Sequence, residues 1–325
     1  MKPFGSIRVA LAVFAVAVTG CGAAPVSVPE PVRTGGWTAA DATRQDLLYA
    51  ATIEGRVFVF SYPHGGVVAT FNVATSDGVW GACADAAGDV FITSEQSSTQ
   101  SFIYEYAHGG TTPIATLRDD GYVASDCSSD PATGDLAVTN FDETSNGGSN
   151  VAIYRRARGK PRRYVDSQMS IAFCGYDGRG NLFVDGDGDY QLAELKKDGT
   201  RLENIRLNEQ LVSPRGVEWH GNELAIEDAG FARKFSAIDR LRLSRSRGTV
   251  TGTTHLDNLA NRGATFWIQG AHILIAGGQQ HNRVGLWNYP AGGHPIKLFR
   301  GTGIRGETLY GVTVSVAPNR AQDSR

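Results

Sequence analysis

Residues 79–93 read VWGACADAAGDVFIT, which is a short apolar strand, a turn containing Gly and Asp, and a second apolar strand. This pattern predicts an antiparallel β-hairpin. The unit recurs as VASDCSSDPATGDLAV at 123–138 and as IAFCGYDGRGNLFV at 171–184, and weaker copies follow at 217–222 and 265–270. The turn glycines at positions 88, 134, 180, 221 and 270 are spaced by 46, 46, 41 and 49 residues. Spacing of this regularity indicates a repeat architecture.

A second β-rich unit lies between these hairpins. Residues 57–71 read VFVFSYPHGGVVATF, and related strand–Gly turn–strand segments occupy 103–117 and 284–299. Degenerate copies surround Gly159, Gly199 and Gly248. Two hairpins in each repeat make a four-stranded sheet. Six copies of the second unit therefore predict an all-β protein, a six-bladed β-propeller of four-stranded antiparallel blades.

The two ends of the repeat region are complementary. Segment 57–71 has no innermost strand before it, whereas 309–316 reads LYGVTVSV and is an innermost strand with nothing after it. We therefore predict that one C-terminal strand joins three N-terminal strands in the sixth blade, which removes the open edges of a linear array. The propeller then spans 46–317, and 318–325 form a polar tail. A two-sheet sandwich is the alternative, but it explains neither the spacing nor the complementary ends.

The composition agrees with a turn-rich β protein. Among 325 residues there are 40 Gly and only 2 Met, and 41% of residues are hydrophobic, enough for a sizeable core. The 31 Lys and Arg nearly balance the 33 Asp and Glu, for a net charge of −2. Binding to nucleic acid through overall charge is therefore not expected, and we expect a monomer.

The first 20 residues have the features of an export signal. Lys2 and Arg8 supply positive charge, and 9–18 is an uninterrupted apolar run. This run is too short for a membrane-spanning helix, which needs about 20 residues. It ends in Val18-Thr19-Gly20-Cys21, which resembles the lipobox of bacterial lipoproteins.

The lipobox resemblance implies cleavage before Cys21 and acylation of the Cys21 thiol. Residues 21–45 would then form a lipidated N-terminus and flexible tether, anchored to a membrane of the cell envelope. Gly22 is not the aspartate that retains some lipoproteins in the inner membrane, so the outer membrane is expected in a Gram-negative organism. An ordinary signal peptide with a cysteine near its cleavage point is the alternative.

The repeat unit resembles NHL-repeat propellers and the wider gluconolactonase-like six-bladed group. Residues 79–92 and 171–184 carry the closest match, and the resemblance covers the architecture of about 46–317. It implies fold far more strongly than activity, because propellers support many unrelated functions.

Gluconolactonase-like enzymes hold a divalent metal at the channel mouth with Glu, Asn and Asp side chains. The corresponding positions here are Asp77, Asp120, Met169, Arg215, Arg262 and Thr308. Two carboxylates with two arginines do not reproduce that metal cage. Asp77, Asp120, Arg215 and Arg262 are therefore our candidates for binding a ligand at the channel mouth, and the arginines suit an anionic one.

A second candidate is the run Asp185-Gly186-Asp187-Gly188-Asp189. Three carboxylates at alternating positions suit Ca²⁺, although the Gly and Glu required later in an EF-hand are absent. A solvated loop that uses Asp and Gly for turns is the favoured interpretation.

Three cysteines, Cys83, Cys127 and Cys174, fall at similar places in consecutive innermost strands. They lack the close pairing of metal sites. The favoured interpretation is small packing residues between blades, and a Cys83–Cys127 disulfide is the alternative. At least one of the three thiols must stay free.

Two further features are predicted to be exposed. His64 and His108 share a place in the Gly-Gly turns, and 155–163 is a basic run on an outer hairpin. A solvated blade edge is favoured for this run over contact with anionic lipid or polysaccharide.

These patterns together predict a membrane-anchored, extracytoplasmic propeller that acts as a binding or interaction scaffold for a protein, glycan or small molecule. The alternative is a metal-dependent lactonase or esterase-type hydrolase with its site at the channel mouth.

Overall fold

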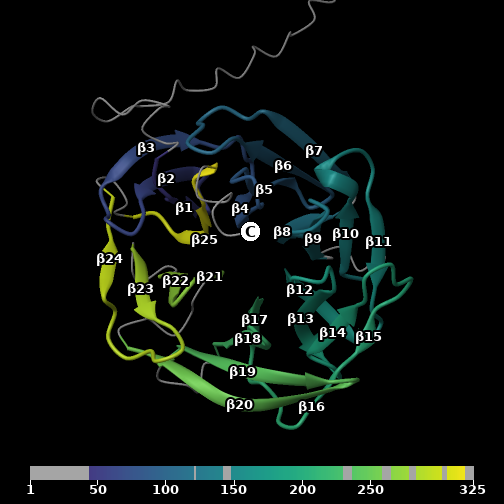
Figure 1. Ribbon diagram of the computed structural model, residues 1–325. Helices are drawn as coiled ribbons and strands as arrows, with labels where there is room; N and C mark the ends of the chain where they lie inside the picture. The colour runs from purple at the N-terminus through teal and green to yellow at the C-terminus, as the bar shows by residue number, and fades with distance from the viewer. Residues whose placement is uncertain are drawn as a thin grey trace, which may run out of the picture.

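The computed structural model describes residues 44–120, 122–141, 148–229, 236–257, 265–277, 283–301 and 306–318. The predicted signal peptide, Cys21, residues 22–43 and residues 319–325 lie outside these ranges, as does Arg262. Within them the chain forms six antiparallel sheets in a ring (Figure 1). The predicted all-β six-bladed propeller is confirmed. None of the described residues belongs to a helix long and apolar enough to cross a membrane.

Apart from β25, which comes from the C-terminal end, the first three blades are built from the N-terminal half of the chain. Blade 1 contains β25 (Leu309–Ser315), β1 (Leu47–Thr52), β2 (Arg56–Ser61) and β3 (Val67–Asn72). Blade 2 contains β4 (Gly78–Ala84), β5 (Val90–Ser97), β6 (Gln100–Tyr106) and β7 (Ala115–Asp120). Blade 3 contains β8 (Val123–Ser129), β9 (Leu136–Phe141), β10 (Asn150–Tyr154) and β11 (Arg162–Val165), with the 3₁₀ turn η1 (Arg155–Ala157) after β10.

The other three blades complete the ring. Blade 4 contains β12 (Met169–Tyr176), β13 (Leu182–Gly188), β14 (Leu192–Leu195) and β15 (Glu203–Asn204). Blade 5 contains β17 (Pro214–His220), β18 (Glu223–Asp228), β19 (Ser236–Ser244) and β20 (Arg247–Leu256). Blade 6 contains β21 (Phe266–Gln269), β22 (His272–Ala276), β23 (Val284–Asn288) and β24 (Lys297–Phe299). Blade 5 also has a short fifth strand, β16 (Arg206–Leu207), which pairs parallel to β20.

Closure of the ring joins the two ends of the chain. β25 pairs with β1 from Leu47↔Ser315 to Thr52↔Leu309, as predicted. His108, which we expected to be an exposed turn residue, bridges this closure instead. Its Nδ1 lies 2.6 Å from Ser315 Oγ, and its Nε2 lies 3.2 Å from the Gln45 carbonyl oxygen. His64, in the same place of the neighbouring turn, is exposed.

The apolar core is divided into six clusters, each between two neighbouring blades. Alternate residues of a strand point to opposite faces of its sheet, so each blade contributes to the cluster on either side. Phe58 and Phe60, for example, pack with Phe299 between blades 1 and 6. Burying one such side chain contributes about 1.5–3 kcal/mol, so the blades stabilise one another rather than folding around a single centre.

The repeated Asp of the inner turns has a structural role. Asp85 Oδ1 accepts hydrogen bonds from the N–H groups of Ala87 and Asp89, both at 2.9 Å. Asp177 and Asp130 accept the equivalent bonds in blades 4 and 3. Gly88 completes the turn with φ of +90°, a conformation that favours glycine. The strand–Asp-turn–strand motif is therefore explained by turn geometry.

The strands alternate in direction, so their connections fall on two faces. One face, which we call the loop face, carries two kinds of connection. These are the loops from one blade to the next and the loops between the second and third strands of a blade. The inner turns such as 85–89 and the outer turns such as 155–161 lie on the opposite face, the turn face. Backbone N–H groups of outer-turn residues Arg156 and Lys197 donate to inner-turn Asp135 and Asn181 across this face, at 2.8 and 3.0 Å.

Two innermost strands are joined covalently. Cys83 of β4 and Cys127 of β8 form a disulfide, with Cα atoms 5.7 Å apart. Our favoured interpretation of these two cysteines as unbonded packing residues was therefore wrong. Cys174 of β12 is free and buried.

Candidate functional site

The predicted channel-mouth residues do not form one group. Asp77 is exposed just before β4, and Asp120 is exposed at the end of β7, the outermost strand of blade 2. Arg118 and Gln100 bond the Asp120 carboxylate, and the hydrogen bond from Arg118 lowers its pKa. Arg215, on innermost strand β17, is the one of the three described candidates that reaches the propeller axis.

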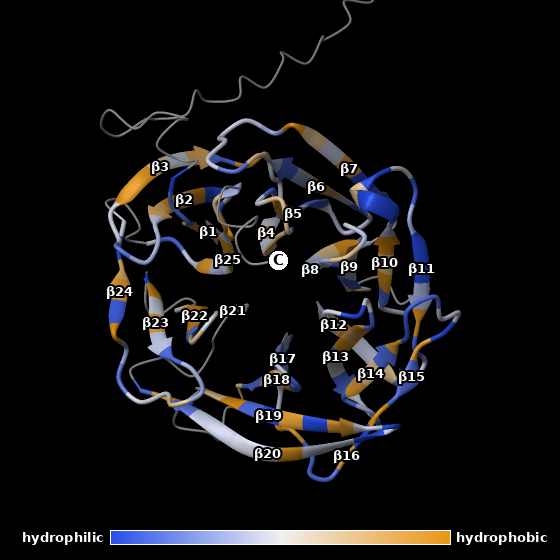
Figure 2. Ribbon diagram, viewed as in Figure 1, coloured by the Kyte–Doolittle hydropathy of each residue, from blue (hydrophilic) through white to orange (hydrophobic). Residues whose placement is uncertain are grey.

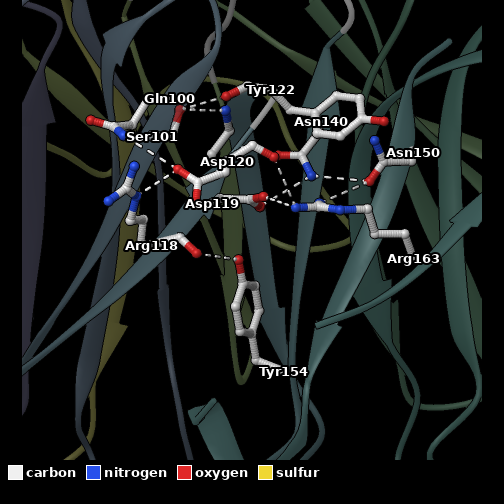
Figure 3. Close-up of polar contacts among 11 residues, drawn as sticks. Gln100, Ser101, Arg118, Asp119, Asp120, Tyr122, Asn140, Asn150, Tyr154 and Arg163 are labelled. Atoms are coloured by element: carbon white, nitrogen blue, oxygen red, sulfur yellow. Dashed lines mark hydrogen bonds and ion pairs between the residues drawn. The ribbon is translucent and has the colours of Figure 1, made fainter. Parts of the chain in front are cut away.

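Beside Asp120, a buried network joins blades 2 and 3 (Figure 3). Asp119 of β7 is fully buried and forms an ion pair with Arg163 of β11. The other Asp119 oxygen accepts from Asn140 Nδ2 at 3.2 Å. The side-chain oxygen of Asn150 accepts from Asn140 and from Arg163, at 3.1 and 3.4 Å. The Arg163 guanidinium also stacks 4.7 Å from the ring of Tyr122.

This network is structural and lies at the loop-face ends of its strands. Arg163 belongs to the basic run 155–163, so one member of that run is committed to holding blades together. Asn140 Oδ1 and Asn150 Nδ2 are buried and have no partner among the described residues. One atom is an acceptor and the other a donor, and the two side chains are in contact, so one water molecule could bond to both atoms.

The propeller axis carries a second polar group, built on bulged strands. β4, β8, β12 and β17 each have a bulge near their loop-face end, at Val79/Ala82, Ala124/Asp126, Ile171/Phe173 and Pro214/Val217. A bulge re-aims the side chains beside it. Arg215 lies within one of these bulges, in hydrogen-bonding reach of Tyr310 on β25.

Three carboxyl groups near the axis each reach across to the next blade. Asp126 of blade 3 accepts from the Cys174 N–H at 3.1 Å. Asp185 of blade 4 accepts from the Gly216 N–H at 3.2 Å. Glu218 of blade 5 accepts from the Ile268 N–H at 2.7 Å. We call Asp126, Asp185 and Glu218 the axial acids; they connect four successive blades.

Burial controls the protonation of the axial acids. Desolvation raises the pKa of Asp126 to about 7, although the N–H bonds from Cys174 and Cys127 oppose the shift. Desolvation also raises the pKa values of Asp185 and Glu218 well above their usual range. The cause is burial, because the charged form of a carboxyl group is disfavoured away from water. Burial raises the pKa of the Cys174 thiol for the same reason.

The space between these strands is small. A cavity of about 30 Å³ is enclosed by residues of blades 2 to 6, among them Asp126, Cys174, Glu218, Phe266 and Trp267. It has room for ordered water but not for a small-molecule ligand, whose pockets measure several hundred Å³. Among the residues that the structure describes, no three His, Cys, Asp or Glu side chains are arranged to hold a metal ion.

The Asp185–Asp189 run is split by the structure. Asp185 belongs to β13 and is completely buried, which corrects its interpretation as part of a solvated loop. Asp187 and Asp189 are exposed, as that interpretation requires. The three carboxylates are not gathered around a common point in the described chain. Asp189 instead borders a groove of about 440 Å³ between blades 4 and 5, lined by 188–191 and 205–210.

Sequence reasoning did not single out Asp119, Asp126 or Glu218. A signal was available for two of them: Asp126 and Glu218 are acidic residues within the predicted innermost strands. A carboxyl group at such a position is buried, and a buried carboxyl group needs a donor. The identity of that donor, a backbone N–H of the next blade, depends on how the blades stack.

The fold is shared with solved structures of low sequence identity. A chain in the crystal structure of a nidogen/laminin complex is 15% identical, with a TM-score of 0.66, and the match covers 84% of this chain and 99% of that chain. A Bacteroides caccae protein of unknown function is 13% identical, with a TM-score of 0.61, over 83% of this chain and 98% of that chain. No protein-family model and no curated protein matches the sequence. At such identities the likeness shows the β-propeller fold alone.

Proposed function

We propose that this protein is an exported, lipid-anchored β-propeller that binds a protein partner through its loop face. The observation that carries the proposal is the groove of about 440 Å³ between blades 4 and 5, which opens on the loop face beside the partly exposed Tyr190. The axial cavity lined by described residues Asp126 and Glu218 measures only about 30 Å³, so we infer that recognition uses the loops of the disk.

The innermost strands of neighbouring blades approach one another closely through small residues. A Cβ atom added to Gly81 of β4 would lie 2.6 Å from the Asp126 Cα atom of β8. One added to Gly175 of β12 would lie 2.3 Å from the Val217 carbonyl oxygen of β17. Contacts this close require glycine, and they make the disk rigid enough to present its loops without rearrangement.

The loop face offers features typical of a protein interface. The groove between blades 4 and 5 has Tyr190 and Gln191 along it. Two apolar side chains are largely exposed on the same side, Val165 at 61% and Val212 at 53%. Partly exposed Tyr and apolar residues beside polar ones are characteristic of binding surfaces. A chain with the same fold occurs in the crystal structure of a nidogen/laminin complex. That complex supports a protein as the kind of partner that this propeller binds.

The anchor part of the proposal rests on the sequence. The resemblance of Val18-Thr19-Gly20-Cys21 to a lipobox supports acylation of the Cys21 thiol. The Cys83–Cys127 disulfide supports export, because disulfides persist in oxidising compartments. The lactonase alternative is not carried forward, since the described residues offer no ligand set for its metal.

The binding proposal is tested by site-specific photo-crosslinking in the native cell. A photoreactive residue at position 190 is expected to crosslink one discrete protein, and Val212→Asp is expected to reduce that product at least tenfold. Thr112→Asp, on an exposed outer turn, is the matched control. Absence of a discrete product at position 190, or equal loss with Thr112→Asp, would overturn a loop-face partner.

The anchor is tested separately by metabolic labelling with a fatty acid. The chain is expected to take up label, and Cys21→Ala is expected to abolish the uptake. Continued labelling of Cys21→Ala would refute acylation at this thiol.

A further inference from the structure

We infer that the turn face docks on an anionic phospholipid surface, so that the loop face points away from the membrane. The inference deepens the proposed function, because it assigns an orientation to the anchored disk. It rests on the charge of the outer turns, on two exposed isoleucines and on the place where the N-terminal segment leaves the propeller.

Three consecutive outer turns form a strongly basic sector. The turns of blades 3, 4 and 5 span 155–161, 196–202 and 245–246. Together with Arg162 and Arg247, the first residues of the strands that follow, they carry ten exposed Lys and Arg residues and one Asp: Arg155, Arg156, Arg158, Lys160, Arg162, Lys196, Lys197, Arg201, Arg245 and Arg247, with Asp198. Figure 2 shows η1 and the adjoining part of β11 as strongly hydrophilic. The net charge of −2 for the whole chain conceals this sector.

The cations of the η1 turn are available to a ligand. Among the described residues, none of Arg155, Arg156, Arg158 and Lys160 is in an ion pair. The nearby inner-turn carboxylates Asp130, Asp135 and Asp177 are held by hydrogen bonds from backbone N–H groups and are outnumbered by the cations of the sector. An anionic surface brought to this sector therefore meets a local excess of positive charge.

The outer turns of blades 6, 1 and 2 are different. They span 289–296, 62–66 and 107–114 and contain no Lys, Arg, Asp or Glu. Two of them end in an exposed isoleucine at the same position, Ile114 at 57% and Ile296 at 50%. The turn face thus combines a basic half with an uncharged half that exposes aliphatic side chains. Basic residues with exposed apolar ones favour a lipid interface, where the apolar groups enter the headgroup region.

The path of the chain places the same face toward the anchor. Gln45, which precedes β1, contacts Ser61 and His108 at 2.5 and 3.2 Å, both at the turn-face ends of their strands. The predicted acylated Cys21 precedes Arg44 by 23 residues. A chain of that length spans at most about 80 Å when fully extended. Because the chain leaves the disk at the turn face, this face has the shortest path to a membrane that holds Cys21.

The strength of the attraction can be anticipated. Each Lys or Arg near an anionic bilayer contributes about 1 kcal/mol, which is about a fivefold change in partitioning. The attraction falls steeply with salt, because exposed charges are screened.

The test uses the full chain with Cys21→Ala, so that acyl chains do not contribute, in co-sedimentation with lipid vesicles. Equimolar phosphatidylglycerol–phosphatidylcholine vesicles are compared with phosphatidylcholine alone. We expect binding to the anionic vesicles that is lost at high salt. Neutralising two sector cations, with Arg158→Gln and Lys160→Gln together, is expected to weaken binding roughly twenty- to thirtyfold.

The matched control neutralises two exposed cations at the loop-face end of outermost strands, Arg118→Gln with Arg300→Gln. Its binding is expected to stay within about twofold of the parent, since these residues lie away from the sector. Equal losses in the two double variants, or equal binding to both vesicle types, overturn the inference. So does preferential binding to the soluble polyanion dextran sulfate with none to vesicles, which would assign the sector to a polysaccharide. Failure of the anchor at Cys21 leaves these outcomes unchanged, because the assay contains no acylated protein.

Discussion

Cys83 and Cys127 form a disulfide because they occupy opposite faces of neighbouring blades. In its hairpin Cys83 pairs with Phe91, the second residue of β5, whereas Cys127 pairs with Val138, the third residue of β9. This difference of one register position reverses the direction in which the side chain points. Cys83 therefore faces blade 3, and Cys127 faces blade 2. Cys174 pairs with Val184, the third residue of β13, and so points the same way as Cys127 and cannot meet it.

The same register argument predicts where a second disulfide can be engineered. Ser128 pairs with Ala137, the second residue of β9. Ser128 therefore occupies in blade 3 the register position that Cys83 occupies in blade 2. Its Oγ accepts from the Tyr176 N–H at 3.0 Å, which shows that it faces blade 4, and Ser128 and Cys174 line the same small cavity. Ser128→Cys is therefore expected to bond Cys174 and to raise the free energy of unfolding by about 3–4 kcal/mol.

Mass spectrometry of the non-reduced protein checks this bond by counting free thiols. Ser129→Cys, one position along β8, points to the other face and is expected to remain a thiol. If Ser128→Cys also keeps two free thiols under oxidising conditions, the register argument is wrong.

Loss of the native disulfide should destabilise the propeller. The bond closes a separation of 44 residues, for which loop entropy predicts a loss of about 4 kcal/mol when Cys83 and Cys127 are both changed to Ala. Urea denaturation with and without reductant measures the effect. Reductant is expected to lower the midpoint of the parent and to leave that of the double variant unchanged; an unchanged parent midpoint would contradict a structural role for the bond.

Stability should fall as pH rises through neutrality. The folded pKa of Asp126 is about 7 and its unfolded value is about 3.8, so the folded state binds the proton more tightly. The protonated Asp126 contributes on the order of 4 kcal/mol to the free energy of unfolding. This contribution is complete below about pH 4 and is lost as the pH rises through about 7. Burial also raises the pKa values of Asp185 and Glu218, so these two acids change the stability in the same direction.

Urea denaturation at a series of pH values measures this slope. Asp126→Asn is expected to flatten it between about pH 4 and pH 7, the interval spanned by the two pKa values. Asp189→Asn, which removes an exposed carboxylate from blade 4, should leave the slope as it is. A parent protein that becomes more stable over this interval would exclude a neutral Asp126.

Arg163 should be far more important for stability than its neighbour Arg162. Arg163→Met leaves the fully buried Asp119 without its counterion, which is expected to cost about 3–5 kcal/mol. Arg162 is exposed, so Arg162→Met is expected to change stability by less than about 0.5 kcal/mol. Asp119→Asn combined with Arg163→Met should recover part of the loss in a double-mutant cycle. Additive effects of the two changes would show that the pair is not coupled.

Much of the fold follows from the spacing of short motifs. Turn glycines such as Gly88 and Gly180 recur at the length of one blade, and the unpaired strand at 309–316 completes the blade that begins at Leu47. These features are local, because a hairpin and its turn are determined by residues close in sequence. They were sufficient for the blade number, the order of strands and the closure. The fifth strand β16, only two residues long, has no such pattern.

The candidate sites followed from the sequence only in part. Arg215 was placed near the axis because the start of an innermost strand is a local property. Asp185 was not recognised as buried, because Asp and Gly also build exposed turns. His108 resembled His64 in its turn, yet only His108 meets the joined chain ends.

The sequence alone determined that this chain forms a ring of six blades, since periodicity and turn chemistry are written in neighbouring residues. The tertiary structure decided which side chains face one another. Cys83 lies two residues before the turn Asp85, and Cys127 lies three before Asp130. That single difference reverses the direction in which the side chain points. The two thiols can form a covalent bond only when the two blades stack side by side. The axial acids likewise acquire their donors and their raised pKa values from the next blade. Contacts between residues distant in sequence, and the exclusion of water from them, exist only in the closed propeller.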